Sequence, residues 1–220
     1  MTIKKHDFIE IDYTGKVEDM VFDTTSEKAA KDNNIFNQGF KYKPMVICIG
    51  ENMVIKGLDT RLEGKEENKE YDFKIPTEEA FGKKDPKLLR MVPMSIFKEQ
   101  NINPMPGLQV NIDGMLGTIR TVGGGRAIID FNHPLSGKDV EYKVKINKLI
   151  TGKKEKLDSY LNYFLGDINT ELTENKAKVF FDKEIDEKVK GTLKNKCKEL
   201  LNIDLEFLKR PKADNKETKG

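Results

Sequence analysis

The stretch that most constrains the fold of this chain is residues 54–62, which combine one apolar helix face with an internal glycine. Apolar residues recur at the three- and four-residue spacing of a single helix face, at Val54, Ile55, Leu58 and Leu62. Gly57 lies within this face and lowers helix propensity, so we predict a short buried helix that another part of the chain approaches closely. Taken alone, such a turn is more typical of core packing than of a binding site.

Strands are predicted on both sides of this helix. Polar and apolar residues alternate, or apolar residues run together, in segments 8–13, 16–22, 45–49, 70–75 and 140–150. We expect a turn at Gly15 between the first two segments, and we expect segment 140–150 to return to the first sheet. Hydroxyl residues followed by helix formers predict a further short helix near residues 24–29.

The composition excludes several classes of protein. A net charge of only +2 on 220 residues argues against binding driven by nucleic-acid phosphates, and no apolar run approaches the roughly 18 residues of a membrane span. Cys48 and Cys197 lie in different segments and are predicted to be buried, reduced thiols. We therefore expect a cytoplasmic protein with no nucleic-acid or membrane partner, no cofactor and no metal site.

Four short motifs occur in an order that resembles one known family. They are Tyr-Thr-Gly at 13–15, Phe-Asp at 22–23, Val-Ile-Lys-Gly at 54–57 and Ala-Phe-Gly at 80–82. Each motif is weak alone, but together they resemble the FKBP family of peptidyl-prolyl isomerases. Residues 132–137, Asn-His-Pro-Leu-Ser-Gly, are similar to a turn of its long prokaryotic, SlyD-like group. The resemblance covers about the first 150 residues.

The resemblance implies an α+β fold in which an antiparallel sheet wraps on a short helix. The isomerase domain would be discontinuous, formed by residues 1–82 and 135–151. Residues 83–134 would form a small β-rich domain inserted in the flap of the isomerase, with chaperone activity. Residues 152–220 would form a C-terminal α/β module.

The resemblance also implies an apolar pocket that rotates X-Pro bonds of client polypeptides. Its catalytic residues would be Tyr13, Asp23, Phe81 and Tyr142, and its substrate-binding residues would be Phe22, Val54, Ile55, Leu58 and Leu135. Two alternatives stay open at this point. The apolar residues could be ordinary core, and Asp23 could be a helix cap before Thr24.

Three of these positions depart from the family pattern. Leu58 stands where many members carry Trp, Phe81 replaces the more usual Tyr, and Tyr142 stands where Phe is common. The first two changes argue against tight binding of macrolide inhibitors. His133 is interpreted as a turn or packing residue, because bond rotation needs no proton transfer.

The reaction requires no nucleophile or acid–base pair. Rotation about a peptide bond breaks the amide resonance, whose charge-separated form is stabilised by water, and it has a barrier of about 18–20 kcal/mol. An apolar pocket that removes water should therefore hold the twisted form better than the planar form. The alternative function is a non-catalytic polypeptide-binding chaperone whose isomerase pocket is vestigial.

Residues 83–134 are the least charged part of the chain and hold four of its eight methionines. Flexible thioether side chains adapt to varied apolar partners, so this segment is predicted to bind clients. The candidate surface residues are Leu88, Met91, Val92, Met94, Ile96 and Phe97. The glycines at 123–125 are interpreted as a hairpin, since no Lys-Ser/Thr pair follows them as in a phosphate loop.

Residues 152–220 are predicted to form helices over 157–165 and 185–201 and strands over 177–181 and 203–208. The apolar face of the second helix consists of Ile185, Val189, Leu193, Cys197 and Leu200. That face is wide for a module of this size, so we expect a homodimer formed through 152–220. The charged residues 211–220 are predicted to be disordered.

Overall fold

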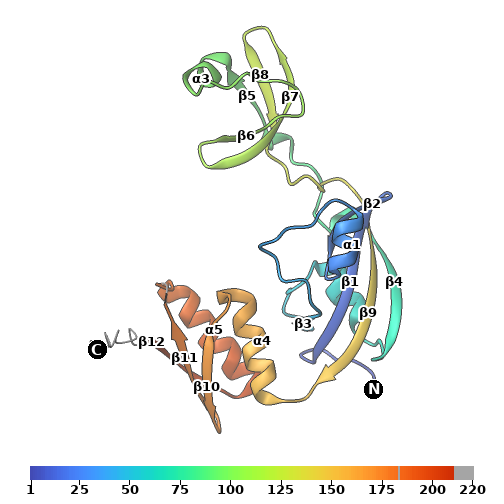
Figure 1. Cartoon of the computed structure of the whole chain (residues 1–220), viewed down its shortest axis with the longest axis vertical. Coiled ribbons are helices and arrows are strands. Elements are labelled where there is room, and N and C mark those ends of the chain that lie inside the picture. The colour runs from blue at the N-terminus through green and yellow to red at the C-terminus, as the bar shows by residue number, and fades with distance from the viewer. Residues whose placement is uncertain (183, 211–220) are drawn as a thin grey trace, which may run out of the picture.

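The computed structural model describes residues 1–182 and 184–210. Its elements form three groups that Figure 1 separates clearly: an N-terminal sheet that β9 completes, a middle segment (83–134) at one end, and a C-terminal segment (152–210). The prediction for residues 211–220 lies outside the described residues. None of the helices in the described part of the chain is long and apolar enough to cross a membrane.

The first group is an antiparallel sheet with two short helices. Its elements are β1 (Phe8–Val17), β2 (Met20–Thr24), α1 (Glu27–Asp32), β3 (Met45–Cys48), α2 (Lys56–Leu62), β4 (Lys69–Ile75) and β9 (Val140–Ile150). The strand order is β2-β1-β9-β4, and β3 pairs with β1. Strand β9 pairs with both β1 and β4, which confirms that segment 140–150 returns to the first sheet.

Helix α2 confirms the prediction made for residues 54–62. Leu58 and Leu62 are fully buried beneath the sheet. At Gly57 an added Cβ would collide with the side chain of Ile75 on β4 and would lie 3.0 Å from the carbonyl oxygen of Glu79. Glycine is therefore required here because β4 and the turn that follows it pass directly against the helix backbone.

The prediction of a turn at Gly15 is wrong. Strand β1 continues through Gly15 to Val17, and the turn lies at residues 18–19, where Glu18 has a left-handed φ of 54°. A Cβ at Gly15 would lie 2.8 Å from the ring of Phe22 and 3.0 Å from that of Tyr142. The glycine thus makes room for two aromatic rings within the sheet, and the sequence alone does not show this.

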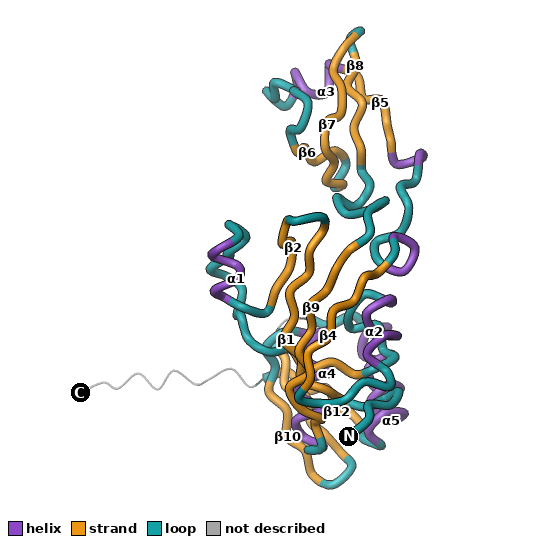
Figure 2. Tube along the Cα trace, turned by 90° about the vertical axis from the view of Figure 1, so that its right-hand side faces the viewer, coloured by secondary structure: helices purple, strands orange, loops and turns teal. Residues whose placement is uncertain are grey.

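The middle segment forms its own four-stranded antiparallel sheet and one helix. Its elements are β5 (Leu89–Pro93), α3 (Met94–Glu99), β6 (Gln109–Ile112), β7 (Met115–Gly123) and β8 (Arg126–Asp130), in the order β5-β8-β7-β6. Glycines 123–125 form the β7–β8 hairpin, as predicted. This sheet has a separate core, and Figures 1 and 2 show two extended stretches of chain joining it to the first group.

The C-terminal segment packs two helices with a three-stranded sheet. Its elements are α4 (Lys153–Leu165), β10 (Asn169–Thr173), β11 (Lys176–Phe181), α5 (Glu187–Leu201) and β12 (Asp204–Lys209). The sheet order is β10-β11-β12, with β11 and β12 parallel. The sequence analysis missed β10, because it carries a single large apolar residue, Leu172. A two-residue turn joins it to β11.

The C-terminal segment shares one apolar core with the first group. The ring of Phe8 on β1 lies 6.3 Å from that of Tyr160 on α4, and Leu193 and Cys197 of α5 belong to the same buried cluster. Most of the helix face that suggested dimerisation is thus covered within one chain, and Val189 remains 41% exposed. The width of that face is therefore no longer an argument for a dimer.

Both cysteines are buried and free, as predicted. Burial raises the pKa of the Cys48 thiol to about 12, and burial likewise raises the pKa of Cys197 to about 12. A thiol with so high a pKa carries almost no thiolate at neutral pH and is a poor nucleophile. The two cysteines therefore serve packing.

Candidate functional site

A cavity of about 1050 Å³ opens above α2 in the first group of elements. Seven of the nine residues predicted to act on substrate line it: Tyr13, Asp23, Val54, Ile55, Leu58, Phe81 and Tyr142. They come from strands β1, β2 and β9, from the start of α2 and from the turn after β4. The structure thus brings residues from five separate parts of the sequence to one cavity.

Two tyrosines and one carboxylate lie together in the inner part of this cavity. Tyr13 on β1 and Tyr142 on β9 have ring centroids 5.8 Å apart, and the Tyr13 hydroxyl donates a hydrogen bond of 2.9 Å to Oδ2 of Asp23. These neighbours follow from strand pairing, since Gly15 pairs with Tyr142 on one side and with Asp23 on the other. The absent side chain at Gly15 lets the ring of Tyr142 lie across β1.

The alternative reading of Asp23 as a helix cap is not supported by the geometry. Helix α1 begins after Ser26, whose hydroxyl accepts a hydrogen bond from the backbone N–H of Ala29. Thr25 uses its own hydroxyl to accept from the backbone N–H of Tyr13 and to donate to Asp12. The Asp23 carboxylate is therefore left to face the cavity with Tyr13 as its partner.

Both tyrosine hydroxyls stay protonated across the physiological pH range. Burial is the main reason that the pKa of Tyr13 is raised far above its usual value, and the Asp23 carboxylate beside it adds to the effect. The pKa of Tyr142 is raised for the same two reasons. Each hydroxyl is therefore a hydrogen-bond donor in a largely apolar cavity.

The floor of the cavity is fixed by the segment that leads into α2. The buried carboxylate of Asp59 accepts hydrogen bonds from the backbone N–H groups of Gly50 and Asn52, at 3.0 and 3.2 Å. These bonds hold the turn that delivers Val54 and Ile55 to the cavity wall. Leu58, one helical turn later, is fully buried and closes the floor.

Phe22 and Leu135 are not among the residues that line the cavity, and their predicted contact with substrate stays a prediction. The ring of Phe22 lies behind the pocket, 5.9 Å from Phe81 and 5.8 Å from Tyr142 in edge-on contacts. Leu135 is partly buried against the same core. Both residues therefore support the wall, and neither forms its inner surface.

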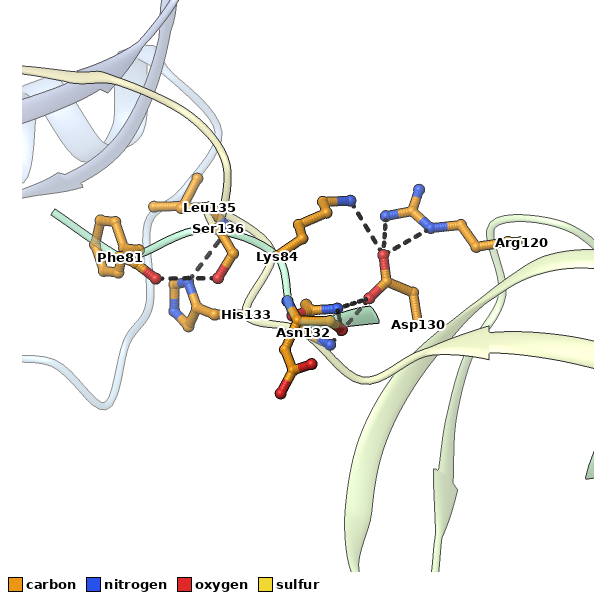
Figure 3. A network of polar contacts seen from close by, with 9 residues as sticks. Phe81, Lys84, Arg120, Asp130, Asn132, His133, Leu135 and Ser136 are labelled. Carbon is orange, nitrogen blue, oxygen red and sulfur yellow. Dashed lines mark hydrogen bonds and ion pairs between the residues drawn. The ribbon is translucent and has the colours of Figure 1, made fainter. Parts of the chain in front are cut away.

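Phe81 is held where the middle segment joins the first group, as Figure 3 shows. The ring of His133 stacks on Phe81 with centroids 4.5 Å apart, and the Ser136 hydroxyl donates to the Phe81 carbonyl at 3.1 Å. The N–H of Gly137 donates to the carbonyl of Gly82 at 2.8 Å. His133 thus has the packing role expected from the sequence.

A second cluster beside this junction is centred on the buried Asp130, also drawn in Figure 3. Burial acts to raise the pKa of Asp130, but hydrogen bonds from Asn132, Arg120 and Lys84 outweigh it and hold that pKa well below its usual range. The carboxylate is therefore ionised and ties β8 to β7 and to the stretch of chain that enters the middle segment.

The outer part of the cavity was not predicted from the sequence. Phe40 and Lys41 in the loop after α1, and Asn162 and Tyr163 at the end of α4, also line it. One signal was present: Tyr163 falls outside the apolar face of α4, so a large aromatic residue was left without a core position. The position of Tyr163 depends on how α4 packs on the first group of elements. That packing cannot be predicted from the residues near Tyr163 in the sequence.

The predicted client surface is only partly exposed. Val92 is 6% exposed and Phe97 is fully buried, so both belong to the core of the middle segment and are removed from that surface. Leu88, Met94 and Ile96 are partly covered, while Met91 is 65% exposed. Strand alternation explains the difference, because neighbouring residues of β5 point to opposite faces of its sheet.

Comparison with known proteins agrees with this geometry. A family model described as FKBP-type peptidyl-prolyl cis-trans isomerase matches residues 1–95, and a model described as the IF domain of FKBP26 matches residues 90–135. The N-terminal part of the chain therefore belongs to the FKBP-type peptidyl-prolyl cis-trans isomerase family, and the two matches together span residues 1–135.

Curated relatives of this isomerase come from archaea and bacteria. A short-type peptidyl-prolyl cis-trans isomerase of Methanocaldococcus jannaschii is 29% identical over 153 residues, which are 70% of this chain and 98% of that protein. A probable FKBP-type 16 kDa isomerase of Pseudomonas fluorescens is 29% identical over 49% of this chain and 73% of its own length. The isomerase SlyD of Escherichia coli is 24% identical over 63% of this chain and 72% of its own length.

Proposed function

We propose that this isomerase rotates X-Pro bonds of polypeptide clients in the cavity above α2, and that the middle segment holds those clients as a chaperone. The observation that carries the first half is the placement of Tyr13, Asp23 and Tyr142 at the rim of an apolar hollow. Around these three residues the wall is apolar, formed by Val54, Ile55, Leu58 and Phe81, which suits a reaction that makes and breaks no covalent bond.

The proposed mechanism is selective binding of the twisted peptide bond. The planar amide carries a charge-separated resonance form that water stabilises, and the twisted state carries less of it. Walls made by Val54, Ile55, Leu58 and Phe81 exclude water and so disfavour the planar form relative to the twisted form. The Tyr142 hydroxyl, which remains protonated, donates a hydrogen bond to the substrate chain, and the Tyr13 hydroxyl, whose proton goes to Asp23, accepts one.

This pocket is tested with two variants and one control. Tyr13→Ala and Asp23→Ala are each expected to lower kcat/KM for tetrapeptide isomerisation by about tenfold or less, which is about 1.4 kcal/mol of barrier. The effect is small because desolvation is spread over many walls. Asp72→Ala removes an exposed carboxylate of β4 that does not line the cavity, and it should leave the rate unchanged.

The measurement is protease-free exchange between cis and trans peptide. A loss of several orders of magnitude in Asp23→Ala would reveal a discrete catalytic group and contradict the desolvation mechanism. No acceleration by the unmodified chain would favour the alternative, a non-catalytic chaperone with a vestigial pocket.

Support for the client-binding half comes from an apolar surface on the middle segment. Leu89 and Met91 lie on one side of β5, and Met91 pairs with Ile128 of β8, so the three side chains share a face. They are 46%, 65% and 38% exposed, on the side opposite the core of the segment. Apolar side chains gathered on an exposed face mark interaction sites.

Replacing residues 85–131 by a short Gly-containing turn separates client binding from bond rotation. This variant keeps the stacking of His133 on Phe81 and the hydrogen bond from the Ser136 hydroxyl to the Phe81 carbonyl. Its kcat/KM for the tetrapeptide should therefore stay within about tenfold of that of the unmodified chain. Catalysis of proline-limited refolding of a whole protein should fall sharply, because clients are no longer held near the pocket. Suppression of aggregation should be lost as well.

The finer experiment keeps the segment and changes its surface. Met91→Ser together with Ile128→Ser should weaken refolding catalysis. Met105→Ser should not, although it removes a methionine that is also exposed, 54% against 65% for Met91, because Met105 lies outside β5 and β8. Equal loss of refolding and tetrapeptide catalysis in the 85–131 replacement would place the segment within the pocket and refute a separate client site.

A further inference from the structure

The cavity that contains the proposed pocket extends well beyond it. Its outer part is lined by Gly39, Phe40, Lys41 and Pro44 of the loop after α1 and by Asn162 and Tyr163 of α4. Figure 1 shows that this loop and α4 lie on the same side of the first sheet. The C-terminal segment therefore contributes part of the wall of the cleft.

Tyr163 is the most prominent residue of that wall. Its neighbours on α4, Tyr160 and Leu161, are buried in the shared core, whereas Tyr163 is 44% exposed. Burial, Asp23 and then the phenols of Tyr142 and Tyr163 all act to raise the pKa of Tyr13, so Tyr163 lies close enough to affect the polar rim of the pocket. A partly exposed aromatic ring in this position is available to a bound chain.

The position of α4 is fixed by several contacts with the first group. Glu51 precedes the turn that leads to α2, and its carboxylate accepts from Lys196 Nζ of α5 at 3.1 Å and from the Tyr160 hydroxyl at 3.4 Å. Lys41 forms an exposed ion pair of 3.2 Å with Asp167, just beyond α4. The wall that carries Tyr163 is thus attached to the same turn that forms the pocket floor.

A second exposed aromatic residue belongs to the loop after α1. Phe40 is 53% exposed and lies 5.0 Å, centroid to centroid, from the ring of Tyr42. The Tyr42 hydroxyl accepts from the backbone N–H of Asn37 at 2.9 Å, which holds the loop in place. Two aromatic rings from separate elements therefore line the outer part of one continuous cavity.

We propose that Tyr163 of the C-terminal segment, together with Phe40, binds the substrate polypeptide on the residues that flank the proline. This inference rests on the pocket proposed above. The cavity of about 1050 Å³ is at the upper end of the range for ligand sites, which is about 300–1,000 Å³, so it has room for more than the prolyl residue. Tyrosine suits such a role, because it presents a large apolar face with little conformational freedom to lose.

The inference has a kinetic consequence that depends on substrate length. An extended tetrapeptide spans at most about 14 Å and a ten-residue peptide at most about 36 Å. Only the longer chain can fill the pocket and continue along the outer wall. The contribution of Tyr163 should therefore appear in kcat/KM for long peptides and be nearly absent for short ones.

The test compares a tetrapeptide with a ten-residue peptide that has the same central X-Pro pair, using the full chain. Tyr163→Ala is expected to lower kcat/KM about five- to tenfold for the long peptide and less than twofold for the tetrapeptide. Tyr163→Phe should retain the activity of the unmodified chain, because the ring makes the contact. Tyr71→Ala is the control: it removes a partly exposed aromatic ring of β4 that packs on Phe73 and does not line the cavity.

The outcomes separate this inference from the proposed pocket. If the unmodified chain fails to accelerate the tetrapeptide, the pocket is wrong and the inference fails with it. If both peptides are turned over and Tyr163→Ala affects them equally, or affects neither, the pocket stands and the inference is refuted. Equal losses in Tyr163→Ala and Tyr71→Ala would also overturn it, since they would show a general effect of removing an aromatic ring.

Discussion

The contact between α2 and the end of β4 leads to a sharp prediction for Gly57→Ala. Alanine at this position would gain at most about 1 kcal/mol of helix propensity. Its Cβ, however, would collide with the Ile75 side chain and lie 3.0 Å from both Cβ and the carbonyl oxygen of Glu79. Part of that contact is backbone, so it cannot be relieved by a change of rotamer alone.

The magnitude follows from comparing the two effects. Overpacking of a filled core costs about 1–3 kcal/mol. Gly57→Ala should therefore be neutral at best and lower the free energy of unfolding by up to about 2 kcal/mol. Gly191→Ala is the matched control, because Gly191 lies within α5 and an added Cβ there meets no atom within 4 Å. That variant should gain up to about 1 kcal/mol.

Thermal unfolding followed by circular dichroism measures the difference. A gap of about 1–3 kcal/mol between the variants corresponds to a Tm difference of about 2–12 °C for a chain of this size. Tetrapeptide isomerisation should also fall in Gly57→Ala, because a displaced α2 moves Leu58 and the wall at Val54. Equal stabilisation by both alanines, with activity retained, would refute the reasoning.

Two further predictions concern the middle and C-terminal segments. Asp130→Asn should destabilise the middle segment by about 1–3 kcal/mol at neutral pH, since it removes the charge that Arg120 and Lys84 neutralise. Because the pKa of Asp130 is depressed in the folded chain, its stabilisation is present above an unfolded pKa of about 3.9 and is lost as the pH falls further. In pH-dependent urea unfolding, the difference from the unmodified chain should shrink below about pH 4, and a constant difference down to pH 2 would contradict this. The homodimer expected from the sequence stays a prediction: light scattering of the full chain decides between the monomer mass of 25.2 kDa and twice that mass.

Local patterns in the sequence were enough to predict most strands and the inner pocket. Alternation located β4 and β9, and the spacing of Val54, Ile55 and Leu58 located the floor of the cavity. These features depend on residues close in sequence and on burial of one face, which periodicity reports directly.

The errors share one physical origin, which is that packing partners are not visible in the sequence. Gly15 looked like a turn residue, but the rings of Phe22 and Tyr142 require the glycine. Val92 and Phe97 were predicted to belong to the client-binding surface, yet strand and helix geometry buries both. The role of Tyr163 depends on how α4 docks on the first group, so no local pattern could assign it to the cleft.

The short distance between the entrance and the exit of the middle segment has a consequence for how this architecture can change. Ile75 of β4 and Val140 of β9 pair directly. The whole middle segment therefore lies within one very long connection, of about sixty residues, between these two antiparallel strands. The entropy of closing a loop grows only with the logarithm of its length, at about 0.6 kcal/mol per doubling. A folded segment whose two ends meet at Gly82 and Gly137 therefore lowers the stability of the sheet only slightly. Insertion, loss or exchange of such a folded segment during evolution can therefore leave the proposed isomerase pocket intact.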